Sequence, residues 1–291
     1  MAVRPWTREE VLLAINLYCK LPYARLTQRS AEVKDLARIL GRTPSAISMR
    51  CCNYAQFDPK ESNRVKGLSH VAKFDKAIWD EVNTDWERFA VECEQILKAI
   101  NPLQNNAPQD REATSILDTE YPIGNDKEQT VRIRVGQQFF RETVLAAYNH
   151  QCCITGLHSD ALLIASHIKP WKNSNPKTER TNPHNGLCLS PLYDKAFDAG
   201  FMTMDEECRI VFSPLLWDCA SREVAQNFFR RYEGKKLFLP ERFSPQQLFF
   251  EYHRRHIFKS KQVISRPHGA QHAKRNVKFF PRLFLKRRPF N

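Results

Sequence analysis

Three polar residues in the C-terminal half have the types and spacing needed for phosphodiester hydrolysis. His167 ends an apolar segment, Asn185 follows 18 residues later, and Asp194 follows after nine more. Hydrolysis of a phosphodiester needs a base that activates water and a cation that neutralises charge on the phosphate and the leaving oxygen. A neutral imidazole can be the base near pH 7, and a carboxylate oxygen suits a hard ion such as Mg²⁺.

Neighbouring residues could support the same chemistry. Asp198 lies four residues after Asp194 and therefore on the same face of an expected helix. The Asn185 side chain could hold the imidazole in its useful tautomer or brace the intervening loop. Each residue also has a plain structural alternative, because a histidine after an apolar strand is often a core residue, Asn-Gly is a common turn dipeptide, and Asp198 could only cap the helix end.

The sequence after residue 131 predicts an α+β arrangement that would position these residues. A helix is expected at Gly136–Tyr148, and another is expected to carry Asp194. Short apolar segments separated by polar loops indicate small strands at 152–155, 162–168, 186–189 and 201–212. His167 would then end one strand, and Asn185 would open the next.

The first hundred residues predict an all-helical region. Thr7 and Glu10 fit a capping box at the start of a first helix, which extends to about Lys20. Further helices are expected at Ala31–Leu40, at Pro44–Ala55 after a Gly41 cap, and, as one or two helices, within Asp75–Ile100.

Two helices joined by a glycine-containing turn, after a packing helix, are typical of a helix-turn-helix. The third helix would expose polar and basic side chains suited to reading the major groove. These are Ser45, Ser48, Arg50 and Asn53. A small helical bundle that holds a partner or the rest of the chain is the alternative.

Charge and composition divide the chain into four parts. The formal net charge of the 291 residues is +13, of which +10 lies in residues 259–291. This tail interleaves basic and aromatic residues, which could bind phosphates and stack on bases; a disordered extension is the alternative. We therefore predict a helical domain at 1–100, a proline-containing linker at 101–130, an α+β domain at 131–258 and the tail at 259–291.

Several function classes lack their sequence signals. No phosphate-binding loop, dinucleotide fingerprint or G-x-S-x-G elbow is present. The chain shows neither an apolar signal core nor a long apolar run, so we expect a cytoplasmic protein with no membrane partner and nine free cysteines. Cys152 and Cys188 are expected to be buried, and His253 and His256 to lie on the surface.

The ordered motifs of the C-terminal half resemble the HNH endonuclease family, which has a ββα-metal fold, and in particular its restriction and defence nucleases. The resemblance spans about residues 132–258 and rests on six stretches. They are Arg134–Arg141, Cys152–Gly156, Ala165–Trp171, Asn182–Leu189, Tyr193–Asp198 and Tyr252–Arg255. It implies that His167 is the general base, that Asn185 is the middle residue of the signature, and that Asp194 occupies the position of the last metal ligand.

Two departures from the family pattern affect the expected metal. Ser166 precedes the base where many relatives have Asp or His, and a hydroxyl is a weaker ligand, which Asp198 could compensate. Asp194 replaces the usual His or Asn, and this change favours Mg²⁺ or Mn²⁺ over Zn²⁺.

The resemblance implies a metal-dependent endonuclease that cuts duplex DNA and acts in restriction or anti-phage defence. Cutting both strands needs two active sites, so we expect a homodimer on DNA. Side chains that could touch nucleic acid are Arg134, Gln137, Arg141 and Lys169. The alternatives are a DNA-binding regulator or scaffold with a degenerate HNH domain, favoured by Ser166, and an HNH nuclease directed at RNA.

Overall fold

The computed structural model describes residues 4–57, 73–100 and 127–260. The basic tail beyond residue 260 and residues 101–126 of the predicted linker lie outside the described residues. Helices dominate the described part, which also contains two two-stranded antiparallel sheets, β1–β2 and β3–β4. The α+β prediction is therefore confirmed.

The α-helices are α1 (Arg8–Lys20), α2 (Ala31–Leu40), α3 (Pro44–Tyr54), α4 (Lys73–Thr84), α5 (Trp86–Ile100), α6 (Lys127–Ala147), α7 (Pro191–Asp198), α8 (Pro214–Cys219), α9 (Arg222–Val224) and α10 (Gln247–His256). The strands are β1 (Ile164–His167), β2 (Gly186–Leu189), β3 (Met202–Met204) and β4 (Ile210–Phe212). Short 3-10 turns are η1 (Tyr23–Arg25), η2 (Ala55–Phe57), η4 (Asp160–Leu162), η5 (Trp171–Asn173), η6 (Pro183–Asn185) and η8 (Arg230–Tyr232), and η7 (Ala225–Phe229) is a π-helical turn.

The N-terminal helices begin and end at the expected signals. The Thr7 hydroxyl accepts from the Glu10 N–H at 3.3 Å, and the Glu10 carboxylate accepts from the Thr7 N–H at 3.0 Å. Gly41 ends α2 with a φ of 58°, a left-handed conformation that glycine adopts without strain. Thr43 then caps α3 through the Ala46 N–H, and Pro44 occupies the first turn.

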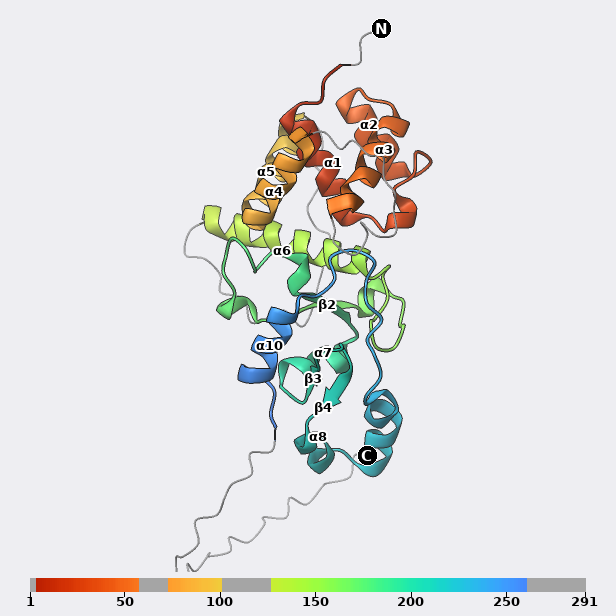
Figure 1. The fold of residues 1–291 in the computed structure, drawn as a ribbon, viewed down its shortest axis with the longest axis vertical. Helices are drawn as coiled ribbons and strands as arrows, with labels where there is room; N and C mark the ends of the chain where they lie inside the picture. The colour runs from red at the N-terminus through yellow and green to blue at the C-terminus, as the bar shows by residue number, and fades with distance from the viewer. Residues whose placement is uncertain (1–3, 58–72, 101–126, 261–291) are drawn as a thin grey trace, which may run out of the picture. The chain divides into compact units, whose positions relative to one another are not determined.

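Helix α6 lies between the N-terminal helices and the β1–β2 hairpin (Figure 1). It packs against α1 and α5 on one side and against β1 and β2 on the other. The helix begins at Lys127, nine residues before the expected start at Gly136. Gly136 lies within the helix and does not mark its start. A Cβ at this position would approach Thr181 Oγ1 to 3.1 Å, so the glycine allows close packing there.

Strands β1 and β2 lie where the sequence predicts strands, and they pair antiparallel as a hairpin, with Ile164 opposite Leu189 and His167 opposite Gly186. The expected strand at Cys152–Thr155 is wrong, because this segment is a turn. The Cys153 N–H donates to the Cys188 carbonyl at 2.8 Å and so attaches the turn to β2.

Gly186 allows α6 to approach the hairpin. A Cβ at this position would lie 2.4 Å from Val144 Cγ2 and 3.1 Å from Phe140 Cζ. We expect Gly186→Ala to lower the free energy of unfolding by about 1–3 kcal/mol, the usual cost of overpacking a core, as measured by urea denaturation. Val144→Ala removes the nearest atom, so adding it to Gly186→Ala should recover part of the loss; strictly additive effects of the two changes would contradict the clash.

A segment after η8 connects the C-terminal part of the fold to the N-terminal helices. The buried Arg242 guanidinium donates to the Tyr18 and Leu21 carbonyls near the end of α1. Phe243 packs against Tyr18 and Trp79, with ring centroids 6.0 and 6.5 Å apart. Among the described residues, most buried hydrophobic side chains from Val11 in α1 to Phe250 in α10 belong to one continuous cluster.

Candidate active site

The candidate site is formed by the β1–β2 hairpin, the loop between its strands and helix α7. His167 is the last residue of β1, and Asn185 immediately precedes β2. The Ile168 N–H donates to the Asn185 carbonyl at 2.9 Å, which extends the pairing one step beyond the strands. Ser190 is the N-cap residue of α7, and α7 packs against β1. The hairpin therefore places His167 and Asn185 at the same end, and α7 carries Asp194.

The His167 imidazole lies half-buried between two aromatic side chains. Its ring stacks on Phe140 of α6 with centroids 3.8 Å apart and planes 9° apart. The ring of Trp171 meets it edge-on at 5.7 Å. These contacts hold the plane of the imidazole.

One hydrogen bond determines which nitrogen of His167 can act as a base. Nε2 lies 2.8 Å from the Arg180 carbonyl oxygen. A carbonyl only accepts, so Nε2 must carry the proton and Nδ1 must hold the free lone pair. Within the described residues no hydrogen-bond partner meets Nδ1. The arrangement leaves Nδ1 available to take a proton from water.

The protonation state of His167 follows from the same surroundings. Burial lowers the pKa of His167 from 6.5 to about 4, and the hydrogen bond to the Arg180 carbonyl opposes part of that shift. The imidazole is therefore neutral throughout the physiological range, as a proton acceptor must be.

His253 provides an internal comparison with His167, and the expectation that it lies on the surface is wrong. It is buried, stacks on Phe197 at 3.7 Å, and donates from Nε2 to the Phe197 carbonyl at 3.1 Å. Its Nδ1, however, lies 2.9 Å from Thr203 Oγ1 and accepts from that hydroxyl. The two histidines have the same tautomer and similar packing, but only His167 keeps its second nitrogen available.

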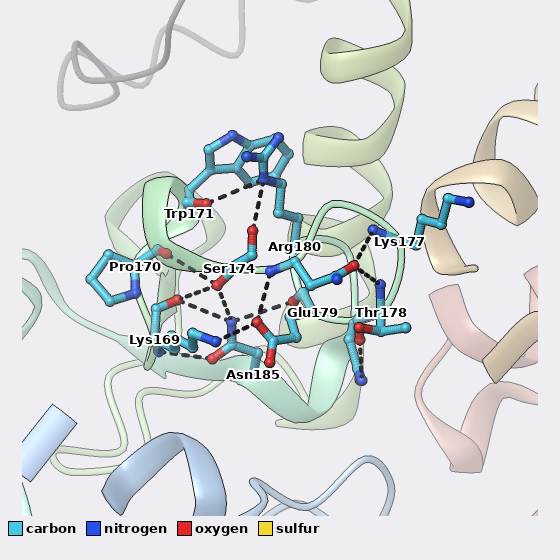
Figure 2. A network of polar contacts seen from close by, with 11 residues as sticks. Lys169, Pro170, Trp171, Ser174, Lys177, Thr178, Glu179, Arg180 and Asn185 are labelled. Atoms are coloured by element: carbon cyan, nitrogen blue, oxygen red, sulfur yellow. Dashed lines mark hydrogen bonds and ion pairs between the residues drawn. The ribbon is translucent and has the colours of Figure 1, made fainter. Parts of the chain in front are cut away.

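Asn185 braces the loop that holds the Arg180 carbonyl (Figure 2). Its side chain is fully buried. Oδ1 accepts from the Lys169 N–H at 2.8 Å, and Nδ2 lies 3.0 Å from the Lys169 carbonyl and 3.3 Å from the Glu179 carbonyl. Since Glu179 and Arg180 are adjacent, Asn185 orients the imidazole indirectly, through the loop.

Other side chains of the loop close the same network. Ser174 Oγ donates to the Lys169 carbonyl at 2.9 Å, and Lys169 Nζ pairs with Glu179 at 2.6 Å (Figure 2). Arg180 Nε lies 3.2 Å from both the Trp171 and Ser174 carbonyls. Sequence reasoning missed Arg180 because the atom that contacts His167 is a backbone carbonyl, which leaves no signal in residue type.

The residues expected to bind metal carry oxygen donors but differ in burial and position. Ser166 is 3% exposed, and its Oγ is buried without a hydrogen-bond partner. Because successive side chains of a strand alternate, Ser166 and His167 point to opposite faces of β1. Asp194 lies half-buried in the first turn of α7, and Asp198 is exposed at its last residue.

Among the described residues no group of three or more His, Cys, Asp or Glu side chains could hold a metal ion. A carboxylate such as that of Asp194 has the oxygen chemistry that suits an ion keeping most of its ligands as water and substrate oxygens, as Mg²⁺ does. All nine cysteines are free, as expected, and Cys152 and Cys188 are buried. A thiolate zinc centre is not formed by the described residues.

The side chains expected to touch nucleic acid near the hairpin differ in their availability. Arg134 is exposed on α6, and Gln137 is half-buried. Arg141 donates to the Leu163 and Asp160 carbonyls at 2.8 and 2.9 Å and so supports the start of β1. Lys169, as noted above, is paired within the loop.

The third N-terminal helix likewise presents only some of its expected reading residues. Ser45 is exposed, and Asn53 is half-buried. Ser48 Oγ donates to the Leu26 carbonyl at 2.7 Å. Arg50 pairs with the buried Asp75 at 2.7 Å and lies 4.2 Å from the Trp6 ring, so its guanidinium is already engaged.

Comparison with known proteins identifies the segment that contains this site. Residues 152–205 match the family model HNH_2, described as HNH endonuclease. The candidate site therefore lies in a segment that is similar to HNH endonucleases. The matched HNH segment includes β1, the braced loop, β2, α7 and β3, and hence His167, Asn185 and Asp194.

Two further comparisons add little to the family match. No curated protein matches the chain. The solved structure "Modification dependent TagI restriction endonuclease" is 21% identical and covers 40% of this chain and 36% of its own, with a TM-score of 0.26. The similarity thus spans about a third of that protein. Within the described residues, no helix has the length and apolarity required to span a membrane.

Proposed function

We propose that this protein is a divalent-metal-dependent endonuclease that hydrolyses DNA phosphodiester bonds, with duplex DNA as its substrate. The observation that carries the proposal is the His167 imidazole, which is neutral, fixed in plane, protonated at Nε2 and open at Nδ1. Such an imidazole has the properties of a general base. The family match of the surrounding segment indicates which bond it acts on.

In the proposed reaction, His167 Nδ1 takes a proton from water as the water oxygen attacks the scissile phosphorus. The bond between phosphorus and the 3′ oxygen breaks, the leaving oxygen takes a proton from solvent water, and the imidazolium then returns its proton to solvent. The Arg180 carbonyl stabilises the imidazolium by accepting its Nε2–H, while the Asn185-braced loop keeps this carbonyl in place. A bound cation would neutralise charge on the phosphate and the leaving oxygen.

The proposed metal site uses Asp194 and Ser166, with Asp198 as a further oxygen donor. Carboxylate and hydroxyl oxygens favour Mg²⁺ or Mn²⁺ over Zn²⁺. The wider assignment follows the resemblance to restriction and defence nucleases: a cytoplasmic enzyme that dimerises on DNA. In this proposal, Arg134 and the helix-turn-helix-like region at 1–100 contact the nucleic acid. The chain is then organised as that helical region, a linker at 101–130, the nuclease domain at 131–258 and a basic tail at 259–291.

Incubation of supercoiled plasmid with the protein tests this function. We expect nicked or linear product with Mg²⁺ or Mn²⁺, little product with Zn²⁺, and none with a chelator. A matched RNA substrate should remain intact; preferential cleavage of RNA would instead identify an RNA-directed nuclease.

A DNA-binding scaffold with a degenerate HNH domain is the second candidate. It is favoured by Ser166, which stands where many relatives have a carboxylate or imidazole, and by the lack of a cluster of three or more metal-binding side chains among the residues that the structure describes. Tight DNA binding without cleavage under any divalent ion would establish this alternative and contradict the nuclease.

A further inference from the structure

A short helical arm beside α7 presents apolar and cationic side chains to solvent. We define the arm as residues 222–236, which comprise α9, the π-helical turn η7, η8 and the residues that follow. Ala225 and Phe229 are buried and attach the arm to the core. Val224 and Phe228, four residues apart and therefore on one face, remain 41% and 49% exposed. The Phe228 ring is therefore available to a ligand on the exposed face of the arm.

The charge of the arm complements a polyanion. All five of its basic residues and both of its acidic residues are exposed. They are Arg222, Arg230, Arg231, Lys235 and Lys236 against Glu223 and Glu233. The described residues place no carboxylate in a salt bridge with Arg230 or Arg231. Their guanidinium groups instead lie over the rings of Trp217 and Tyr232, at 4.5 and 5.0 Å.

The arm is attached to the helix that carries Asp194. Tyr193, the residue before Asp194, donates from its hydroxyl to the Phe228 carbonyl. Its ring also meets Phe229 and Tyr232 edge-on, with centroids 6.1 and 5.6 Å apart. Any ligand bound to the arm would thus lie beside the helix of the proposed metal site.

We propose that this arm is a nucleic-acid-binding surface for the DNA that flanks the cleaved phosphate. Arg222, Arg230 and Arg231 contact backbone phosphates, and Phe228 packs against a base or inserts at a base step. The combination of exposed aromatic and arginine side chains favours nucleic acid over an apolar protein surface, because the cations would otherwise be buried without anions. The inference rests on the proposed function, since it assigns part of the substrate contact of that site.

Binding of a fluorescein-labelled duplex, measured by anisotropy over a salt series, tests the arm. All proteins carry His167→Ala so that the duplex stays intact. We expect Arg230→Ala with Arg231→Ala to weaken binding about tenfold and to lower the salt slope by about 2, one unit per lost phosphate contact. Phe228→Ala should weaken binding about fivefold or more with an unchanged slope.

Matched controls separate arm binding from general effects of charge or folding. Arg255→Ala removes an exposed arginine from α10, and Leu248→Ala removes an apolar side chain of similar exposure to Phe228 from the same helix. Both should bind like the parent protein, and thermal melts should show that every variant is folded.

A plasmid-cleavage assay of the arm variants with His167 intact distinguishes failure of the arm proposal from failure of the nuclease proposal. If the parent cuts plasmid and the arm variants bind and cut equally well, the arm proposal is overturned while the nuclease stands. If Phe228→Ala dissociates a dimer in sedimentation without changing DNA affinity, the surface is a contact between copies, and the proposal is also overturned. If the parent protein cuts nothing, the nuclease proposal fails, and the anisotropy measurements still show whether the arm binds DNA.

Discussion

Replacing His167 with alanine is expected to lower the single-turnover rate of DNA cleavage by a factor of about 10²–10⁴, the usual contribution of a positioned general base. The change removes Nδ1, which is the candidate proton acceptor. DNA affinity should change little, because the imidazole faces Phe140 and Trp171 and its Nε2 is bound to the loop.

His158→Ala is the matched control for this variant, since His158 is exposed in the loop before η4. It should cleave at the wild-type rate. A His167→Ala protein that remains folded and cleaves as fast as the His158→Ala protein would remove His167 from the reaction.

The pH profile of the wild-type enzyme should reflect the lowered pKa of His167. A base works only when it is unprotonated, so its contribution persists as pH falls and is half lost near the pKa, at about 4. A histidine of ordinary pKa would lose half of its activity near pH 6.5. We expect kcat/KM for cleavage to remain nearly constant between pH 7 and pH 5; a midpoint near 6.5 would contradict the enclosed imidazole.

Asn185→Ala is the second change with a large expected effect. It leaves the Lys169 N–H and the Lys169 and Glu179 carbonyls without their buried partner. Unfolding free energy should fall by about 2–4 kcal/mol, as expected for several lost buried hydrogen bonds. Displacement of the Arg180 carbonyl should also lower kcat, by a factor on the order of 10² if the imidazole shifts by about 1 Å.

The kinetic signature separates this positioning role from substrate binding. Asn185 is fully buried, so its loss should lower kcat while KM stays nearly constant. Asn173→Ala, at an exposed position of the same loop, should alter neither stability nor rate. A raised KM with unchanged kcat would instead place Asn185 in direct contact with the substrate.

Local signals in the sequence predicted much of the fold. Thr7, Gly41 and Thr43 mark helix ends through hydrogen bonds within a few residues, and the structure confirms each of them. Asn185-Gly186 marks the start of β2 for the same reason. Gly136 misled the prediction because a contact with Thr181, 45 residues away, explains its presence within α6.

The candidate site was predictable in its residue types but not in its supporting contacts. The positions of His167 and Asn185 follow from their places at strand ends. The Arg180 carbonyl, the engagement of Arg141 with Asp160 and Leu163, and the burial of His253 depend on contacts between distant segments. The residue types alone do not predict such contacts.

The most direct test of the central claim is the cleavage rate of a His167→Gly protein with and without added imidazole. Removing the side chain leaves a space beside Phe140 and Trp171 that matches the size of the lost ring. We predict a rate at least about a hundredfold below wild type without imidazole, and a saturable increase when imidazole is added. A His167→Gly protein that cleaves at the wild-type rate without imidazole would contradict His167 as the base.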